Sequence, residues 1–315
     1  MCTAIGTRMG DFYFGRSMDI ECGFGGELTL APRNFPIKLH FIDTLNTHHA
    51  ILGMAANVNG YPLYADAFNE KGLCMAGLLF PQSAYYPDTP IDGKTPLCPF
   101  ELMPYILGVC SDIYEARELL ESVTLVNKPF SSTVPLSPLH WIISDRYGSL
   151  TVEPTQSGLE IYKNDFGVLS NEPPFPYHTE NIKRYIGLSP AYRGSGALGD
   201  LSPFGGGLCA TGLDGDYSSP SRFTRAAYLA RVCMPTPNAA EEAKAAHLLA
   251  LIGSVAPPHG AVLDAEGRPH YTLYSCCINA DKGIYYLKKY GELTTHTVKI
   301  SEYNLYSDTP IITCT

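Results

Sequence analysis

Charged side chains are scarce in this 315-residue chain, where they make up 17% of the residues against roughly 25% in typical soluble domains. The net charge is −9 and no run of Lys or Arg is present, so the sequence offers nucleic acid no basic surface. No apolar stretch reaches the roughly 18 residues that span a bilayer, and the N-terminus lacks the basic and apolar regions of an export signal. We therefore expect a cytoplasmic protein that neither binds nucleic acid nor inserts into membranes.

Paired metal ligands are absent as well. The ten cysteines are scattered without a CxxC pair, and without an export signal a disulfide framework is not expected. Most of them lie in apolar segments and are predicted to be small buried hydrophobes. No HExxH or GxSxG motif occurs, which excludes zinc proteases and typical serine hydrolases. His48 and His49 are adjacent and on a strand would point to opposite faces, so we expect no metal.

One set of glycines has the spacing of a known cofactor-binding motif. Gly194, Gly196 and Gly199 have the GxGxxG spacing of a dinucleotide-binding turn, which needs a strand before it and a helix after it. Here a proline lies just upstream and more glycines follow, so the segment is predicted to be a surface loop. The sequence therefore predicts no organic cofactor.

Turn-forming and strand-forming residues are abundant. The chain contains 29 Gly, 25 Pro and 21 Tyr, and its 45% hydrophobic content is enough for a large core. Asp112 and Glu115 are placed as a capping box at the start of a helical pattern. The patterns predict strands at 3–7, 11–19, 27–31, 50–58, 72–80, 140–145, 149–154, 158–164, 271–278, 282–290 and 295–300, and helices at 99–110, 111–123, 177–188, 221–233 and 238–255. This order favours an α+β fold in one domain, residues 1–315, whose two termini share sheets.

The N-terminal segment MCTAIGTRMGDFYFGRSMD has the components of a nucleophile. Removal of Met1 would leave Cys2 with a thiol and a free α-amine, which are a nucleophile and a base on one residue. Arg16 and Asp19 lie on the second predicted strand. A turn near Met9–Gly10 would bring that strand back beside Cys2, and a guanidinium near the thiol favours the thiolate. Because such residues also occur by chance, this segment alone leaves an ordinary structural role open.

Longer sequence blocks add a family resemblance. MCTAI and FGRSMD, followed in order by NEKGLCMAGLLFP, VPLSPLHWIISD, GVLSNEP, GDYSSPSRFTRAA and YTLYSCCINADKGIYY, resemble the choloylglycine hydrolase family of N-terminal nucleophile hydrolases. That family includes bile salt hydrolases and penicillin V acylases, and the resemblance is strongest to bile salt hydrolases of Gram-positive gut bacteria. It implies an αββα sandwich, in which two antiparallel sheets lie between helical layers.

The resemblance also implies site residues. Cys2 matches the family nucleophile after loss of the initiator methionine, while Arg16 and Asp19 match the residues that flank its thiol and amine. Asn171 matches the asparagine whose side-chain N–H helps form the oxyanion hole, and Arg222 matches the last active-site arginine. Taken singly, the asparagine could cap a turn and the arginine could be a surface ion-pair partner.

Leu79 departs from the family pattern. It stands, in AGLLFP, where bile salt hydrolases usually carry Asn and penicillin V acylases usually carry Tyr. A leucine side chain donates no hydrogen bond, but the resemblance assigns the backbone N–H at this position to the oxyanion hole. We therefore expect turnover to survive and substrate selectivity to change.

The implied reaction is hydrolysis of the amide of glycine- or taurine-conjugated bile salts through a thioester acyl-enzyme. Met18, Phe24, Phe130, Val134 and Leu139 match positions that line the steroid pocket, although each alone is more typical of core packing. Bile salts are anionic and the chain is acidic, so the two active-site arginines would have to attract the substrate locally.

Alternatives remain for the activity. A penicillin V acylase or an acyl-homoserine lactone acylase would use the same nucleophile, whereas a non-catalytic binding protein has no use for one. An amine could intercept the thioester, so acyl transfer to other amino acids is an expected side activity. The glycine-rich segment 193–207 resembles the family's assembly loop, which implies a homotetramer.

Overall fold

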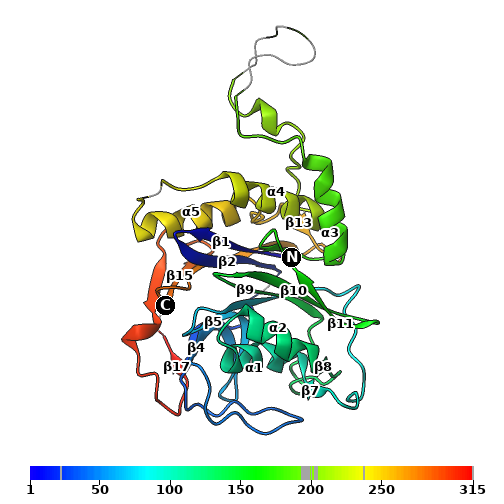
Figure 1. The fold of residues 1–315 in the computed structure, drawn as a ribbon, viewed down its shortest axis with the longest axis vertical. Coiled ribbons are helices and arrows are strands. Elements are labelled where there is room, and N and C mark those ends of the chain that lie inside the picture. The colour runs from blue at the N-terminus through cyan, green and yellow to red at the C-terminus, as the bar shows by residue number, and fades with distance from the viewer. Residues whose placement is uncertain (22, 193–198, 200, 202–204, 237, 314–315) are drawn as a thin grey trace.

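The computed structural model describes residues 1–315 except 22, 193–198, 200, 202–204, 237, 314 and 315. Two β-sheets lie face to face between two helical layers, so the molecule has four layers (Figure 1). This is the αββα sandwich of antiparallel sheets that the resemblance predicted.

The first sheet brings the two ends of the sequence together. Its strand order is β12-β1-β2-β14-β15-β16, and β13 pairs with β14. Because β2 pairs with β14 along most of its length, the predicted sharing of sheets between the termini is confirmed. The strands are β1 (Cys2–Met9), β2 (Asp11–Ile20), β12 (Val168–Leu169), β13 (Val262–Leu263), β14 (Pro269–Asn279), β15 (Ile284–Lys289) and β16 (His296–Lys299).

The second sheet is built from the middle of the chain. Its order is β11-β10-β9-β6-β5-β4-β3-β17, and a separate parallel pair joins β7 (Thr95–Leu97) to β8 (Val123–Leu125). β5 was not predicted, although its sequence alternates between buried and half-buried residues over its first half. The strands are β3 (Gly26–Ala31), β4 (Ile51–Val58), β5 (Tyr61–Asn69), β6 (Cys74–Leu79), β9 (Leu139–Asp145), β10 (Gly148–Thr155), β11 (Gly158–Lys163) and β17 (Ile311–Ile312).

Helices cover the outer face of each sheet (Figure 1). α3 (Phe175–Asn181), α4 (Ser219–Val232) and α5 (Glu241–Gly253) belong to the layer on the first sheet, and α1 (Leu102–Val109) and α2 (Ile113–Glu121) to the layer on the second. Short 3-10 turns occupy Pro99–Glu101, Ile182–Tyr185, Leu208–Ala210 and Ile300–Glu302. The helix predicted over 177–188 is therefore shorter, since only its first part is α-helical.

The start of α2 corrects one detail of the sequence analysis. Asp112 caps the helix as predicted, because its carboxylate accepts from the N–H groups of Tyr114 and Glu115. The Glu115 carboxylate, however, accepts from the N–H of Ser111 instead of returning to Asp112. In a capping box this carboxylate would accept from the N–H of the N-cap residue, Asp112, but here it accepts from the residue before it.

The hydrophobic core forms two clusters. One joins the first sheet to α4, α5 and the inner face of the second sheet, and the other joins the second sheet to α1 and α2. Ile51 and Leu52 are neighbours on β4 but belong to different clusters, because successive strand residues point to opposite faces. The second sheet is therefore buried on both sides.

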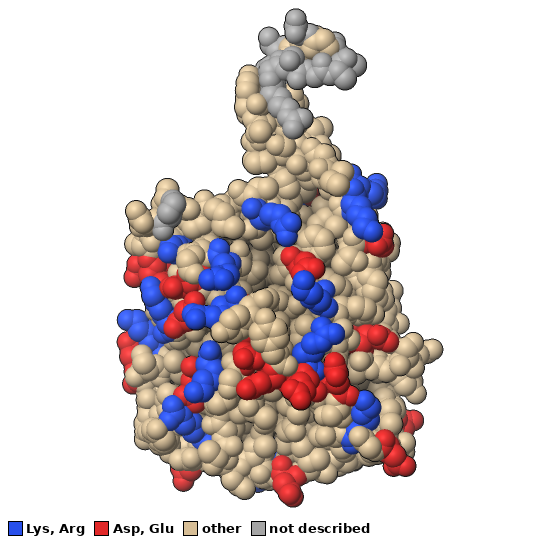
Figure 2. Space-filling view, in the orientation of Figure 1, with Lys and Arg blue, Asp and Glu red and all other residues tan. Residues whose placement is uncertain are grey.

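Between α3 and α4 the chain leaves the body as an arm, which we define as the described residues 186–192, 199, 201 and 205–213 (Figure 1). Its exposed side chains include Ile186, Tyr192, Leu201 and Leu208, and none of these described residues is charged (Figure 2). Most of the expected assembly segment 193–207, including Gly194 and Gly196, lies outside the described residues. Within the part that is described, no helix is both long enough and apolar enough to cross a membrane.

Candidate active site

Cys2 begins β1 and belongs to the buried core between the two sheets. β1 and β2 form a hairpin whose turn at Gly10 has φ +89°, and the pairing places Cys2 opposite Met18. The turn that was predicted near Met9–Gly10 is thus present. Cys2 is 1% exposed, and its Sγ lies 3.9 Å from Met18 Sδ.

Arg16 approaches Cys2 from the same hairpin and is fully buried. Its guanidinium enters the gap between β5 and β6, where Nη1 donates to the carbonyls of Ala65 (3.0 Å) and Gly77 (3.2 Å). Nη1 also lies 3.9 Å from the carboxylate of Asp66, a buried residue that sequence reasoning missed. Burial by itself lowers the pKa of Arg16, but its interactions with the Cys2 thiol, Tyr274 and Asp66 outweigh burial, and the pKa is raised. The arginine therefore remains a fixed cation beside the thiol.

Asp19 is the second charged residue of this hairpin and is fully buried. Its carboxylate accepts from Ser17 Oγ (2.8 Å) and Thr272 Oγ1 (2.6 Å), which fixes its orientation. Its backbone pairs with Met1, since the Asp19 N–H donates to Met1 O (3.0 Å) and the Met1 amine donates to Asp19 O (2.5 Å). With Met1 in place, the nitrogen of Cys2 is an amide that donates to Asn171 Oδ1 (2.8 Å).

Asn171 and Arg222 reach Cys2 from distant parts of the chain. Asn171 Oδ1 accepts from the Cys2 N–H and from Arg222 Nη2, both at 2.8 Å, and Asn171 Nδ2 donates to Leu79 O (2.8 Å). These partners assign the oxygen and nitrogen of the side-chain amide. Arg222 Nη1 donates to Thr3 Oγ1 (2.6 Å) and to Cys2 O. Burial lowers the pKa of Arg222, while Asp19 and Cys2 oppose that shift.

Leu79 ends β6 with its peptide directed towards Asn171. The Phe80 N–H donates to Pro138 O (2.9 Å), so Phe80 is in a hydrogen-bonded pair. Hydrogen-bonded and non-hydrogen-bonded pairs alternate along antiparallel strands, and the next pair, Leu79 with Leu139 of β9, is therefore not hydrogen-bonded. Its N–H and C=O therefore both face away from β9, on the side where Asn171 Nδ2 contacts the carbonyl. Within the part of the chain that the structure describes, the second hydrogen of that amide nitrogen and the Leu79 N–H remain available as donors, and Leu79 lines the same cavity as Cys2.

A cavity of about 380 Å³ opens beside the thiol. Its lining includes Cys2, Leu79 and all five of the predicted substrate-pocket residues, namely Met18, Phe24, Phe130, Val134 and Leu139. No charged side chain is among its described lining residues. A larger cavity of about 490 Å³ lies under β11 and α2 and contains none of the predicted site residues.

One expectation about the two arginines is wrong. Arg16 and Arg222 were expected to attract an anionic substrate, but both are 0% exposed and neither lines the cavity. Their guanidinium groups are directed at backbone carbonyls and at Asn171 instead. They hydrogen-bond groups around Cys2 and Asn171 and present no charge to the cavity.

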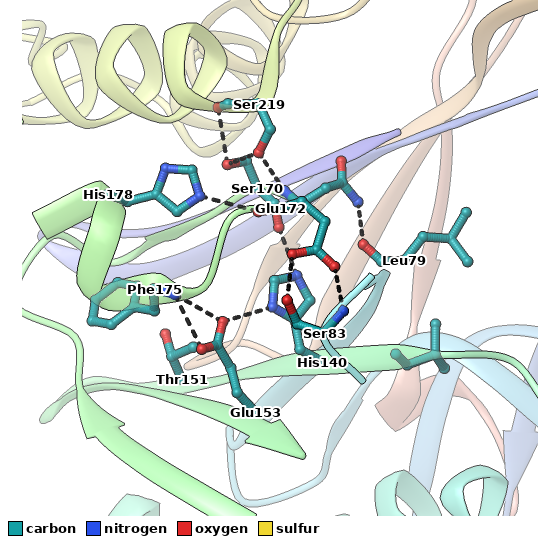
Figure 3. A network of polar contacts seen from close by, with 12 residues as sticks. Leu79, Ser83, His140, Thr151, Glu153, Ser170, Glu172, Phe175, His178 and Ser219 are labelled. Carbon is teal, nitrogen blue, oxygen red and sulfur yellow. Dashed lines mark hydrogen bonds and ion pairs between the residues drawn. The ribbon is translucent and has the colours of Figure 1, made fainter. Parts of the chain in front are cut away.

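Figure 3 shows a further set of polar residues around Asn171 that the sequence analysis did not single out. His140 and Glu153 are fully buried and in contact, and His178 donates to the Asn171 carbonyl. Two of the missed residues, His140 in LHWIISD and Asp66 in LYADAFN, are polar residues within apolar strand sequences. That pattern could have identified them, because a buried polar group needs a hydrogen-bond partner. Within the described residues, no group of His, Cys, Asp and Glu is arranged to hold a metal ion.

The fold and site define a class of protein. Two antiparallel sheets between helical layers, with a cysteine at the start of the first strand facing a cavity, form the arrangement of an N-terminal nucleophile hydrolase. The sequence profile described as linear amide C–N hydrolases, choloylglycine hydrolase family, matches residues 2–313.

Individual relatives agree with that profile. The chain is 39% identical to a bile salt hydrolase/transferase of Lactiplantibacillus plantarum, over 97% of this chain and 94% of that relative. It is 36% identical to a conjugated bile acid hydrolase of Lactobacillus gasseri, over 98% of each chain. A crystal structure of a mutant conjugated bile acid hydrolase from Clostridium perfringens matches with a TM-score of 0.92 at 33% identity, over 100% of this chain and 97% of that one.

A penicillin V acylase from Agrobacterium tumefaciens also has this fold, with a TM-score of 0.76 at 20% identity over 98% of this chain and 89% of the acylase. The chain therefore belongs to the choloylglycine hydrolase family of linear amide C–N hydrolases, as the resemblance predicted.

Proposed function

We propose that this protein hydrolyses the amide of glycine- or taurine-conjugated bile salts. The observation that carries the proposal is the position of Cys2, which lies at one side of an uncharged cavity whose walls suit a rigid apolar acyl group. The relatives named as bile salt hydrolases support the same substrate class. Residues 1–315 would act as one catalytic domain.

The proposed reaction begins when Met1 is removed and the Cys2 amine becomes free. The Cys2 thiolate, beside the fixed cation of Arg16, attacks the amide carbon, and the oxyanion accepts from the Leu79 N–H and from Asn171 Nδ2. The α-amine passes its proton to the leaving amino acid, which leaves a thioester. Water then releases the bile acid, and an amine that attacks instead of water would give acyl transfer.

Leu79 gives the second candidate function its support. A penicillin V acylase or acyl-homoserine lactone acylase would use the same nucleophile and oxyanion donors, and Leu79 replaces the polar side chain that bile salt hydrolases usually place at this position. We expect Leu79→Asn to change kcat/KM for conjugated bile salts relative to penicillin V by roughly tenfold, about the worth of one hydrogen bond. If the ratio of the two kcat/KM values is unchanged, Leu79 does not determine selectivity between these substrates.

The arm supports a proposal about assembly. Its exposed apolar side chains, Ile186, Tyr192, Leu201 and Leu208, would be covered by neighbouring copies in a homotetramer. The eight described cysteines that form no disulfide suit a reducing compartment such as the cytoplasm, where we place the protein.

The decisive experiment measures glycine, taurine and phenoxyacetate release from glycocholate, taurocholate and penicillin V, with the intact mass of the same sample. We expect release from the bile salts by chains that lack Met1. Cys2→Ala should lower kcat by at least roughly 1,000-fold. Cys110→Ala, which changes another buried cysteine away from the cavity, should leave kcat unchanged.

Release from penicillin V alone would establish the second candidate. No release from any of the three by a chain without Met1, or full activity of Cys2→Ala, would contradict the proposed function.

A further inference from the structure

The backbone that carries Asn171 is held from both sides by buried histidines (Figure 3). The carbonyl of Ser170 contacts His140 Nε2 at 2.8 Å, and the carbonyl of Asn171 contacts His178 Nε2 at 3.0 Å. A carbonyl oxygen only accepts, so both imidazoles donate through Nε2. The Asn171 N–H donates to Ser219 Oγ (2.9 Å), at the start of α4. Every backbone polar group at this position is thus fixed.

Glu153 holds the other ring nitrogen of His140. Its Nδ1 lies 3.0 Å from Glu153 Oε1, and that carboxylate also accepts from the Phe175 N–H at 3.0 Å. Because Nε2 must donate, a proton also has to lie between Nδ1 and Oε1, whether the pair is ionised or neutral. Both side chains are 0% exposed, so water does not compete for these bonds.

His140 also contacts the strand that supplies the other oxyanion donor. Its ring stacks on Phe80, the residue after Leu79, with ring centroids 4.3 Å apart and an interplanar angle of 6°. On β9 it pairs with Leu78, the residue before Leu79. The imidazole therefore packs against the residue after Leu79 and hydrogen-bonds the residue before Asn171, while the His140 backbone pairs with the residue before Leu79. Neither His140 nor Glu153 lines the cavity beside Cys2 and both are 0% exposed, so neither can touch a substrate there.

From this arrangement we propose that His140, held by Glu153, is a positioning residue that sets the separation of the two oxyanion donors, the Leu79 N–H and the Asn171 amide. The proposal rests on the proposed function, since it assumes that these groups bind the oxyanion. Such donors act only within about 2.7–3.1 Å of the oxyanion, and a 1 Å displacement can lower a rate by about 100-fold.

A second contact joins the segment that contains Asn171 to the segment that contains Leu79. The Glu172 carboxylate accepts from the Ser83 N–H (3.0 Å) and Ser83 Oγ (2.8 Å), so the chain after Asn171 is already tied to the chain after Leu79. Loss of the His140 contact should therefore displace the Ser170 peptide without separating the segments. The expected effect is on catalysis more than on folding.

The first test compares Glu153→Ala with Glu153→Gln. A glutamine can donate to His140 Nδ1 and accept from the Phe175 N–H, so it preserves both bonds of a neutral pair. We expect Glu153→Ala to lower kcat by about 10- to 100-fold with KM changed less than about threefold, and Glu153→Gln to restore most of kcat. Alkylation of Cys2 by iodoacetamide, which needs no oxyanion donor, should keep its wild-type rate in both variants.

The matched control is Asp145→Ala. Asp145 is another buried carboxylate, at the end of β9, and it accepts from the N–H groups of Ile113 (2.8 Å) and Tyr147 (2.7 Å), away from the cavity. Its loss should lower the melting temperature with kcat unchanged. If Glu153→Ala behaves like Asp145→Ala, the pair is merely structural and the proposal is overturned.

A second comparison separates the two bonds of His140 and remains informative if Glu153→Ala does not fold. His140→Gln places an amide nitrogen near the position of Nε2 and can keep the bond to Ser170 O. His140→Asn places it near Nδ1 and keeps only the contact with Glu153. We expect the Gln variant to retain at least about tenfold more kcat than the Asn variant. Equal values or the reverse order would contradict the proposal.

Each variant is also measured by the burst of 4-nitrophenol when 4-nitrophenyl acetate acylates Cys2, a step that needs the oxyanion donors but no bile salt. A wild-type enzyme that gives the burst but releases nothing from conjugated bile salts would contradict the proposed function alone. A wild-type enzyme that hydrolyses bile salts, with variants whose bursts and kcat values match it, would contradict this inference alone.

Discussion

The two histidines that hold the Asn171 backbone differ in their second nitrogen. His140 has a partner for each ring nitrogen, whereas His178 Nδ1 is buried and has no hydrogen-bond partner among the described residues. His178 also stacks on Phe223, with ring centroids 4.7 Å apart. A proton on Nδ1 would therefore be buried, and burial lowers the pKa of His178 to about 4.

This difference predicts how stability depends on pH. An unfolded histidine takes up its proton near pH 6.5, while folded His178 resists protonation down to about pH 4, so the unfolded state binds more protons between these values. The unfolding free energy should therefore fall as pH decreases from 6.5 to 4, by about 1.4 kcal/mol per pH unit from this residue. Urea unfolding at several pH values measures the slope.

His178→Gln keeps a donor for the Asn171 carbonyl but cannot titrate, so it should remove that part of the slope. His247→Gln is the control, because the His247 Nε2 also contacts a backbone carbonyl, Cys233 O, but the residue is only partly buried. Equal slopes for wild type and His178→Gln would show that His178 is protonated in the folded state.

At the scale of elements, β2 carries most of the residues near Cys2 and depends on a close approach to its neighbours. Gly15 precedes Arg16, and a Cβ built on it would lie 2.3 Å from Cys276 O on β14 and 2.7 Å from Ile252 Cδ1 on α5. Only a residue without a side chain lets the strand and helix pack at this distance. The position of Arg16 and Asp19 is thus linked to the packing of α5 on the first sheet.

We predict that Gly15→Ala destabilises the protein by about 2–3 kcal/mol and lowers kcat, because the strand must move away from β14 to admit the methyl group. Gly253→Ala, at the end of α5, is the control, since no neighbouring atom lies within 4 Å of a Cβ at that position. Thermal unfolding and kcat measured for both variants test this prediction. A Gly15→Ala protein as stable and active as the control would show that the sheet accommodates the side chain.

At the scale of the whole molecule, the described residues of the arm differ from the body in charge. Both signs of charge are interspersed over the face of the body in Figure 2, while the described residues of the arm include no charged residue. Ile186, at its base, is 93% exposed. An apolar surface of this kind is typical of contacts between protein copies.

We therefore predict that Ile186→Asp lowers the solution mass from that of a tetramer to smaller species, because a buried unpaired carboxylate would oppose assembly. Leu293→Asp changes a fully exposed leucine outside the arm and should leave the mass unchanged. Sedimentation velocity at several protein concentrations measures both. A wild-type protein that sediments as a monomer would contradict the proposed tetramer.

The sequence by itself determined what depends on neighbouring residues and on long matched blocks. The β1–β2 hairpin followed from two strand patterns around Gly10, and the cap of α2 from Asp112, because turns and caps are local structures. The family and the sandwich fold followed from blocks spread along the whole chain. Asn171 and Arg222 were named only through that resemblance, because no local pattern relates them to Cys2.

Only the tertiary structure decided which distant groups meet. Asn171 contacts Cys2 across 169 positions and Arg222 does so across 220, contacts that require both sheets and α4 to be in place. Asp66, His140 and Glu153 were missed because a buried polar residue has no sequence signature apart from its apolar surroundings. The two arginines were expected to face the substrate, and the packing of β5, β6 and α4 buried them instead. A charge can be read from the sequence, but its direction is set by the elements packed around it.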